Sequence, residues 1–171
     1  MAGKRFEIVG TPYNSVPTHR WQTAAAATII EKGMLLKKTG AGSPYVTPLV
    51  TGDFTIATDV AIVGLAANDS THTASVDGVI DVYLPLPGLL YRGYATTAAN
   101  IDTRAELDLL RGDRVDITVS ATTSAGNWTI NEDLGDTVAQ AFQIIDGDPV
   151  KGTIDFIIRA GATSLDDSTI A

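Results

Sequence analysis

The stretch Asp113-Arg-Val-Asp-Ile-Thr-Val-Ser120 is the part of the chain that decides the fold class. Apolar and polar side chains alternate along it, and this period of two is typical of a β-strand with one buried face. The residues before it have helical features instead. Thr103 and Glu106 form a capping box, and Gly112 stands where a helix commonly ends in left-handed backbone. The sequence therefore predicts one short helix, at about residues 103–111, that leads into a strand.

Strand-length patterns recur on both sides of this stretch about every ten to fifteen residues, between turns rich in Gly, Asp and Pro. Residues 34–38 and 45–50 flank such a turn and predict a hairpin. Residues 60–66 are a continuous apolar run, which favours a strand buried on both faces, and Gly64 within it indicates a bulge or a close backbone approach. Further candidate strands are 74–84, 127–130, 140–145 and 152–159. The prediction is an all-β chain, a single β-barrel or β-sandwich domain.

The composition agrees with this prediction and excludes several kinds of chemistry. Of the 171 residues, 16 are Asp, only 4 are Glu, 22 are Thr and 16 are Gly, a composition that suits turns and pleated surfaces. The chain has no Cys, so disulfides, cysteine-ligated zinc and thiol nucleophiles are excluded. No apolar stretch approaches the roughly 20 residues of a membrane helix, and residues 1–10 lack the apolar core of a secretory signal. We expect a soluble, unprocessed product.

Charge and proline content divide the chain into three parts. Residues 1–31 predict an extended N-terminal arm broken by two prolines, residues 32–160 a β-rich body, and residues 161–171 a loose C-terminal tail. Residues 1–40 hold six basic and two acidic side chains, whereas the rest hold six and eighteen. An arm that docks on an acidic neighbour and an ordinary acidic domain both fit this asymmetry. The acidic body would repel phosphates, so we expect no nucleic-acid partner, and no membrane partner either.

Two sets of residues are candidates for contacts with a partner. The first set lies in the arm, where a large aromatic beside a cation is a common interface anchor, although an ordinary core tryptophan is the simpler explanation. Its members are Lys4, Arg5, Arg20 and Trp21. The second set is an apolar stretch whose two prolines keep it out of a central strand, at an edge or in a loop. Its members are Leu84, Pro85, Leu86, Pro87 and Leu89.

Catalytic constellations are weak in this sequence. The two imidazoles are His19 and His72; Asp69 and Ser70 near His72 supply the residue types of a hydrolase triad, but without a nucleophile elbow. Acidic turns are common but do not fit the calcium loop of EF-hands, and no phosphate-binding glycine loop occurs. We therefore expect no catalytic residues, no metal site and no cofactor, and a protein that is not an enzyme.

Four stretches of the body, residues 32–36, 60–66, 112–117 and 126–131, together with the proline-broken basic arm, give the chain the pattern of one known family. The chain resembles the head decoration, or cement, proteins of tailed bacteriophages. The resemblance implies a structural virion protein, made in the host cytoplasm and often trimeric, that binds the capsid exterior. There it would stabilise the shell by clamping neighbouring major capsid subunits. Its partners would then be the major capsid protein and further copies of itself, with the arm and residues 84–90 as contacts.

A second class of function stays open, a carbohydrate- or receptor-binding β-sandwich such as a fibre or adhesin head. Sugar sites present exposed aromatic rings in a polar groove, and the chain offers four candidate rings, although core packing also explains them. These rings belong to Tyr83, Tyr91, Tyr94 and Trp128.

Overall fold

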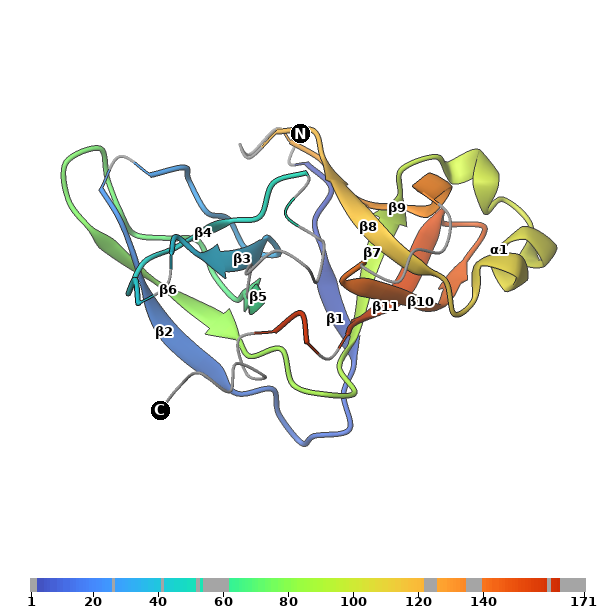
Figure 1. The fold of residues 1–171 in the computed structure, drawn as a ribbon, viewed down its shortest axis with the longest axis horizontal. Coiled ribbons are helices and arrows are strands. Elements are labelled where there is room, and N and C mark those ends of the chain that lie inside the picture. The colour runs from blue at the N-terminus through green and yellow to red at the C-terminus, as the bar shows by residue number, and fades with distance from the viewer. Residues whose placement is uncertain are drawn as a thin grey trace.

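The computed structural model describes residues 3–25, 27–40, 42–51, 53, 62–121, 126–134, 140–159 and 161–163. Within these residues the chain forms two β-sheets side by side, with one α-helix at the outer end of the sheet that contains β10 (Phe142–Asp148) and β11 (Thr153–Ile158) (Figure 1). The first half of the chain supplies the strands β1 (Glu7–Gly10), β2 (Thr18–Thr23), β3 (Leu35–Lys38), β4 (Val46–Pro48), β5 (Ile62–Ala66) and β6 (Gly78–Tyr83). The second half supplies β7 (Leu90–Ala95), α1 (Arg104–Leu110), β8 (Arg114–Val119), β9 (Trp128–Asn131), β10 (Phe142–Asp148) and β11 (Thr153–Ile158).

Five strands close into a β-barrel. Their order is β7-β11-β10-β8-β9, and β9 returns to pair in parallel with β7 through Tyr94↔Thr129 and Ala95↔Ile130. The alternation predicted for β8 is confirmed, because Val115 and Ile117 are fully buried. Aromatic rings fill the barrel around Phe156, whose ring centre lies 5.3 to 5.6 Å from those of three neighbours, Phe6, Tyr91 and Phe142. The all-β prediction is confirmed, with a closed barrel and a second sheet.

The second sheet has the order β2-β6-β5-β3-β4, and all its pairings are antiparallel. The predicted hairpin is formed by β3 and β4, and every residue of β5 is buried. Gly64 in β5 has a φ of 138°, and a Cβ there would lie 2.0 Å from the carbonyl oxygen of Tyr83. This glycine therefore marks the close backbone approach that the sequence predicted.

The predicted helix is confirmed together with its cap. Thr103 accepts a hydrogen bond from the backbone of Glu106, whose carboxylate in turn accepts one from the backbone of Thr103. Gly112 follows the helix with a φ of 89°. Leu107 is the buried residue of α1 and packs on the hairpin of β10 and β11 near Gly147. In the described residues no helix has the length and apolarity needed to cross a membrane.

The N-terminal segment is extended, but it is built into both sheets rather than standing apart from them. β1 pairs with β7, and β2 pairs with β6 over six residues. Phe6 is 3% exposed, and its ring lies over Gly93 inside the barrel. The aromatic side chain of Phe6, which lies within the predicted arm, thus fills space that the barrel strands leave open.

The predicted C-terminal tail begins within the packed structure. The backbone N–H of Ile62 donates to the carbonyl of Ala162, and Thr163 forms an isolated parallel bridge with Ile62. Ala162 is buried. Residues 164–171 lie outside the described residues, as do residues 60 and 61 at the start of the predicted apolar run.

Candidate interaction surface

Two proline-bearing loops that are about 70 positions apart in the sequence lie against each other at one end of the molecule. Residues 11–17 connect β1 to β2, and residues 84–88 lead from β6 toward β7 (Figure 1). The hydroxyl of Tyr13 donates to the carbonyl oxygen of Pro87 at 2.9 Å. The backbone N–H of Leu84 donates to the carbonyl oxygen of Pro17 at 3.1 Å. We call these two loops, residues 11–17 and 84–88, the proline platform.

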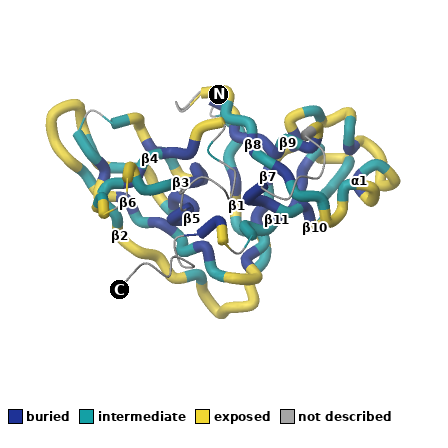
Figure 2. Tube along the Cα trace, in the orientation of Figure 1, coloured by how far each residue is buried: buried dark blue, intermediate teal, exposed yellow. Residues whose placement is uncertain are grey.

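The proline platform is exposed but held in place. Residues 11–15 and Pro17 are exposed, as are Pro87 and Gly88, and Figure 2 shows the exposed β1–β2 loop at the bottom of the molecule. Gly88 has a φ of 82°, and a Cβ there would lie 3.2 Å from the ring of Pro12. Because each proline also fixes its own backbone φ, the platform presents a surface with little conformational freedom to lose on binding.

The second predicted contact set contributes to this platform unequally. Pro87 is exposed, Leu84 and Leu86 are half-buried, and Pro85 and Leu89 are buried. Leu89 belongs to the hydrophobic core. Buried side chains cannot touch a partner, so of this set Pro87 and the edges of Leu84 and Leu86 are available for contact.

Arg20 and Trp21 lie on opposite faces of β2, just after the platform. The guanidinium of Arg20 is exposed and forms two hydrogen bonds with the carboxylate of Asp81 on β6, at 2.9 and 3.2 Å. These bonds lower the pKa of Asp81. Trp21 is half-buried against the core, with the ammonium of Lys38 5.6 Å from its ring centre.

Lys4 and Arg5 lie at the barrel rather than on a free arm. Arg5 is 13% exposed, and its guanidinium donates to Glu31 at 2.8 Å and to the carbonyl oxygens of Lys4 and Gly126. The ammonium of Lys4 lies 4.8 Å from the ring centre of Tyr94. Arg5 therefore ties the N-terminal segment to the fold, whereas Lys4 keeps donors for a partner.

The residue types of a hydrolase triad are partly brought together. The Oγ of Ser70 lies 2.9 Å from Nδ1 of His72, whose Nε2 lies 3.1 Å from the carbonyl oxygen of Ala27. A carbonyl only accepts, so we assign the imidazole proton to Nε2 and the hydroxyl proton of Ser70 to the bond with Nδ1. Asp69 does not join them, because its carboxylate accepts from the backbone of Lys32. Ser70 also accepts from Ile30, so these bonds tie a loop to its neighbour.

Acidic side chains gather beside α1 without a recognisable metal site. Glu106, Asp113, Glu132 and Asp133 line an open depression of about 470 Å³. The carboxylate of Glu132 accepts hydrogen bonds from two backbone N–H groups, and burial raises its pKa. Among the described residues, no group of three or more His, Asp or Glu side chains is placed to hold a metal ion.

The four candidate aromatic rings for a sugar site are not equivalent. Tyr91 and Trp128 are buried inside the barrel, and Tyr83 is half-buried against the core. Tyr94 alone among the four is an exposed ring, at 39%. It lines an open depression of about 480 Å³ on the outside of the barrel, together with Lys4, Glu7, Arg92 and Thr153.

This second depression was not predicted from the sequence. Glu7 lies opposite Arg92, which lies opposite Asp155, while Tyr94 lies opposite Thr153. Three strands thus place these side chains on one outward face. The sequence predicted a strand at β11 but none at β7. The pairing of these strands with each other and with β1 joins distant segments and leaves no local sequence signal.

Comparison with known proteins identifies no relative, because no protein-family model, curated protein or solved structure matches the chain.

Proposed function

We propose that the chain is a structural virion protein that binds the outer surface of a phage capsid as a homotrimer and stabilises the shell by clamping neighbouring major capsid subunits. One observation carries the proposal. The two segments that the sequence marks as contact candidates, the proline-broken lead-in and the apolar proline stretch, meet in one exposed platform.

The composition of the platform supports a protein contact. It presents the ring of Tyr13, three exposed prolines (Pro12, Pro17 and Pro87) and short polar side chains, and Arg20 follows it on β2. Aromatic residues and arginine are enriched at protein interfaces, and a platform that is already rigid loses little entropy on binding. Three such platforms in a trimer would bind with avidity even if each contact is weak.

Binding of this kind would stabilise the shell by linkage. Contacts that exist only in the assembled capsid favour that state over dissociated subunits. Arg20, which follows the platform on β2, provides an exposed donor for capsid carboxylates, whereas Lys4 lies half-buried beside Tyr94, away from the platform. Arg5 and the ring of Trp21 act indirectly, because they hold the N-terminal segment and β2 in place.

Co-sedimentation with expanded capsids that lack the chain tests the proposal. A deletion of residues 2–20 would be an unsuitable test of the platform, because it would also remove Phe6 from the core. We would instead replace Ser15 at the exposed tip of the platform with Trp, which blocks close approach and removes no internal hydrogen bond that we observe. The matched control is Ser75→Trp, in an exposed turn before β6.

The wild-type chain and Ser75→Trp are expected to pellet with capsids at the same saturating ratio, and Ser15→Trp to bind at least about tenfold more weakly. Equal binding by all three proteins would refute the platform as the contact surface.

Light scattering on the free chain tests the trimer. The monomer mass is 17.9 kDa, and we expect light scattering to give three times that mass; a monomer mass would refute the trimer.

A further inference from the structure

The outward face formed by β1, β7 and β11 combines an exposed aromatic ring with hydrogen-bonding groups of both polarities. Tyr94 keeps 39% of its surface exposed even with the ammonium of Lys4 over one face of its ring. Arg92 is held by Asp155 through two hydrogen bonds, from Nε at 2.6 Å and from Nη2 at 2.8 Å. Nη1 of Arg92 takes no part in this pairing.

One side chain that lines this depression has an unmet hydrogen bond. Thr153 is 5% exposed, and its hydroxyl oxygen is buried without a hydrogen-bond partner among the described residues. Thr153 lies directly opposite Tyr94 across the β7–β11 pair, so the two residues share one face of the sheet. A buried hydroxyl without a partner is costly, and a hydrogen bond to a polar ligand at this face would recover that cost.

The charges around the depression balance each other. Three cations line it, Lys4, Arg5 and Arg92. Arg5 is paired with Glu31 and Arg92 with Asp155, so the ammonium of Lys4 and the exposed carboxylate of Glu7 remain as one charge of each sign. Such a surface has no net attraction for an anion or for a cation. It suits a neutral ligand whose groups donate and accept at once, as hydroxyls do.

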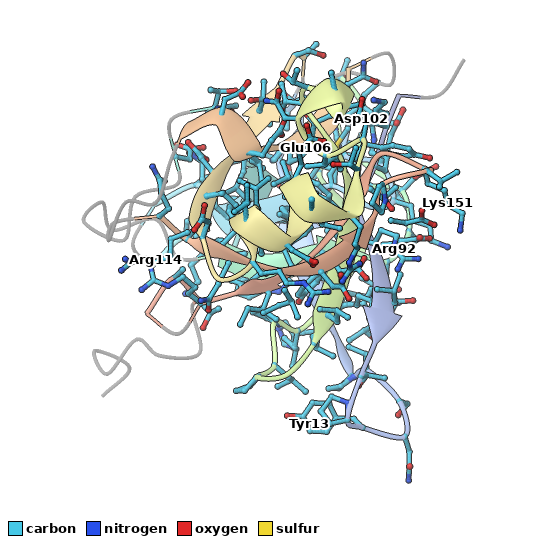
Figure 3. All side chains as sticks on the ribbon, turned by 90° about the vertical axis from the view of Figure 1, so that its right-hand side faces the viewer. Tyr13, Arg92, Asp102, Glu106, Arg114 and Lys151 are labelled. Atoms are coloured by element: carbon cyan, nitrogen blue, oxygen red, sulfur yellow. The ribbon has the colours of Figure 1, made fainter. Side chains whose placement is uncertain are left out.

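We propose that this depression binds a neutral sugar, with the ring of Tyr94 against the apolar C–H face of the sugar. Glu7 and the free edge of Arg92 would hydrogen-bond its hydroxyls. The volume of about 480 Å³ falls within the usual range for small-molecule sites and holds one or two sugar residues. The site is separate from the proline platform, because Figure 3 shows Tyr13 beyond one end of β1 and Arg92 beside its other end.

Two experiments on the whole chain test this site. The first is a screen on a glycan array, and the second is a titration with neutral mono- and disaccharides in which NMR follows the amide shifts. We expect millimolar or tighter binding, with the largest shifts in β7, β11 and residues 3–7. Tyr94→Ala is expected to weaken binding at least about tenfold. Glu7→Gln, which keeps the shape and removes the charge of an acceptor, is expected to weaken it severalfold.

The matched control is Tyr13→Ala, because Tyr13 is also 39% exposed but belongs to the platform. It should leave sugar binding unchanged. If no neutral sugar shifts these amides at about 10 mM, or if Tyr94→Ala binds as well as the wild-type chain, the site is refuted. The capsid experiment is independent of these results, since its variants lie on the platform, so each proposal can fail without the other.

Discussion

Asp116 shows how a single side chain links this fold to pH. It lies half-buried on β8, and burial, together with the nearby carboxylate of Asp53, raises its pKa to about 6. Asp53 itself is paired with the ammonium of Lys37 at 2.6 Å. A carboxyl group whose pKa is higher in the folded than in the unfolded chain makes the folded state less stable as pH rises from about 4 to about 6.

We therefore expect Asp116→Asn to stabilise the protein at neutral pH and not at acid pH. Because water screens this half-exposed carboxylate, the expected gain in the free energy of unfolding at pH 7.5 is about 1 kcal/mol, falling to near zero at pH 4. Urea unfolding of both proteins across this pH range measures the difference. A gain that is the same at every pH would contradict the titration of Asp116.

Gly64 is a second residue with a local effect that can be measured. Its φ of 138° is strained for any other residue, and a Cβ would lie 2.0 Å from the backbone oxygen of Tyr83. Gly64→Ala is expected to lower the free energy of unfolding by about 3 kcal/mol or more, through backbone strain and displacement of β6. The control is Gly40→Ala, where a Cβ would meet nothing within 4 Å. Similar unfolding midpoints for the two variants would contradict this packing.

At the scale of elements, the parts predicted from the sequence are those whose causes are local. The helix α1 was predicted with its cap because Thr103, Glu106 and Gly112 act within a few residues of each other. The β3–β4 hairpin and the buried strand β5 follow from alternation, apolar length and turn residues in the same way.

The parts that sequence reasoning missed depend on contacts between distant segments. The parallel pairing of β9 with β7 closes the barrel over more than 30 intervening residues. The meeting of Tyr13 with Pro87, and the depression at Tyr94, depend on pairings of the same kind. Composition and periodicity report which face of a strand is buried, but they do not report which strand lies next to it.

The first strand gives a test at this scale, because β1 and the residue before it were expected to lie in an arm. Phe6→Ala is expected to lower the free energy of unfolding by about 3 to 5 kcal/mol, since its ring contacts Phe156 and Trp128 inside the barrel. Val9→Ala, on the exposed side of the same segment, should cost less than about 1 kcal/mol. Thermal unfolding of both variants distinguishes a core segment from a detachable arm, for which Phe6→Ala would have little effect.

For the whole molecule, the arrangement separates two surfaces. The loops that join the two sheets form the proline platform (Figure 1). The outer face of the barrel carries Tyr94 and its polar neighbours. If the platform faces a capsid, the two-sheet body gives it a rigid base, because each platform loop connects a strand of one sheet to a strand of the other. The platform must then lie at the boundary between capsid subunits.

Electron cryomicroscopy of expanded capsids mixed with the purified chain tests this claim most directly. We predict additional density on the capsid exterior at local three-fold positions, into which three copies fit with residues 11–17 and 84–88 against the major capsid subunits. Capsids that carry no additional density at saturating concentrations of the chain would contradict the account.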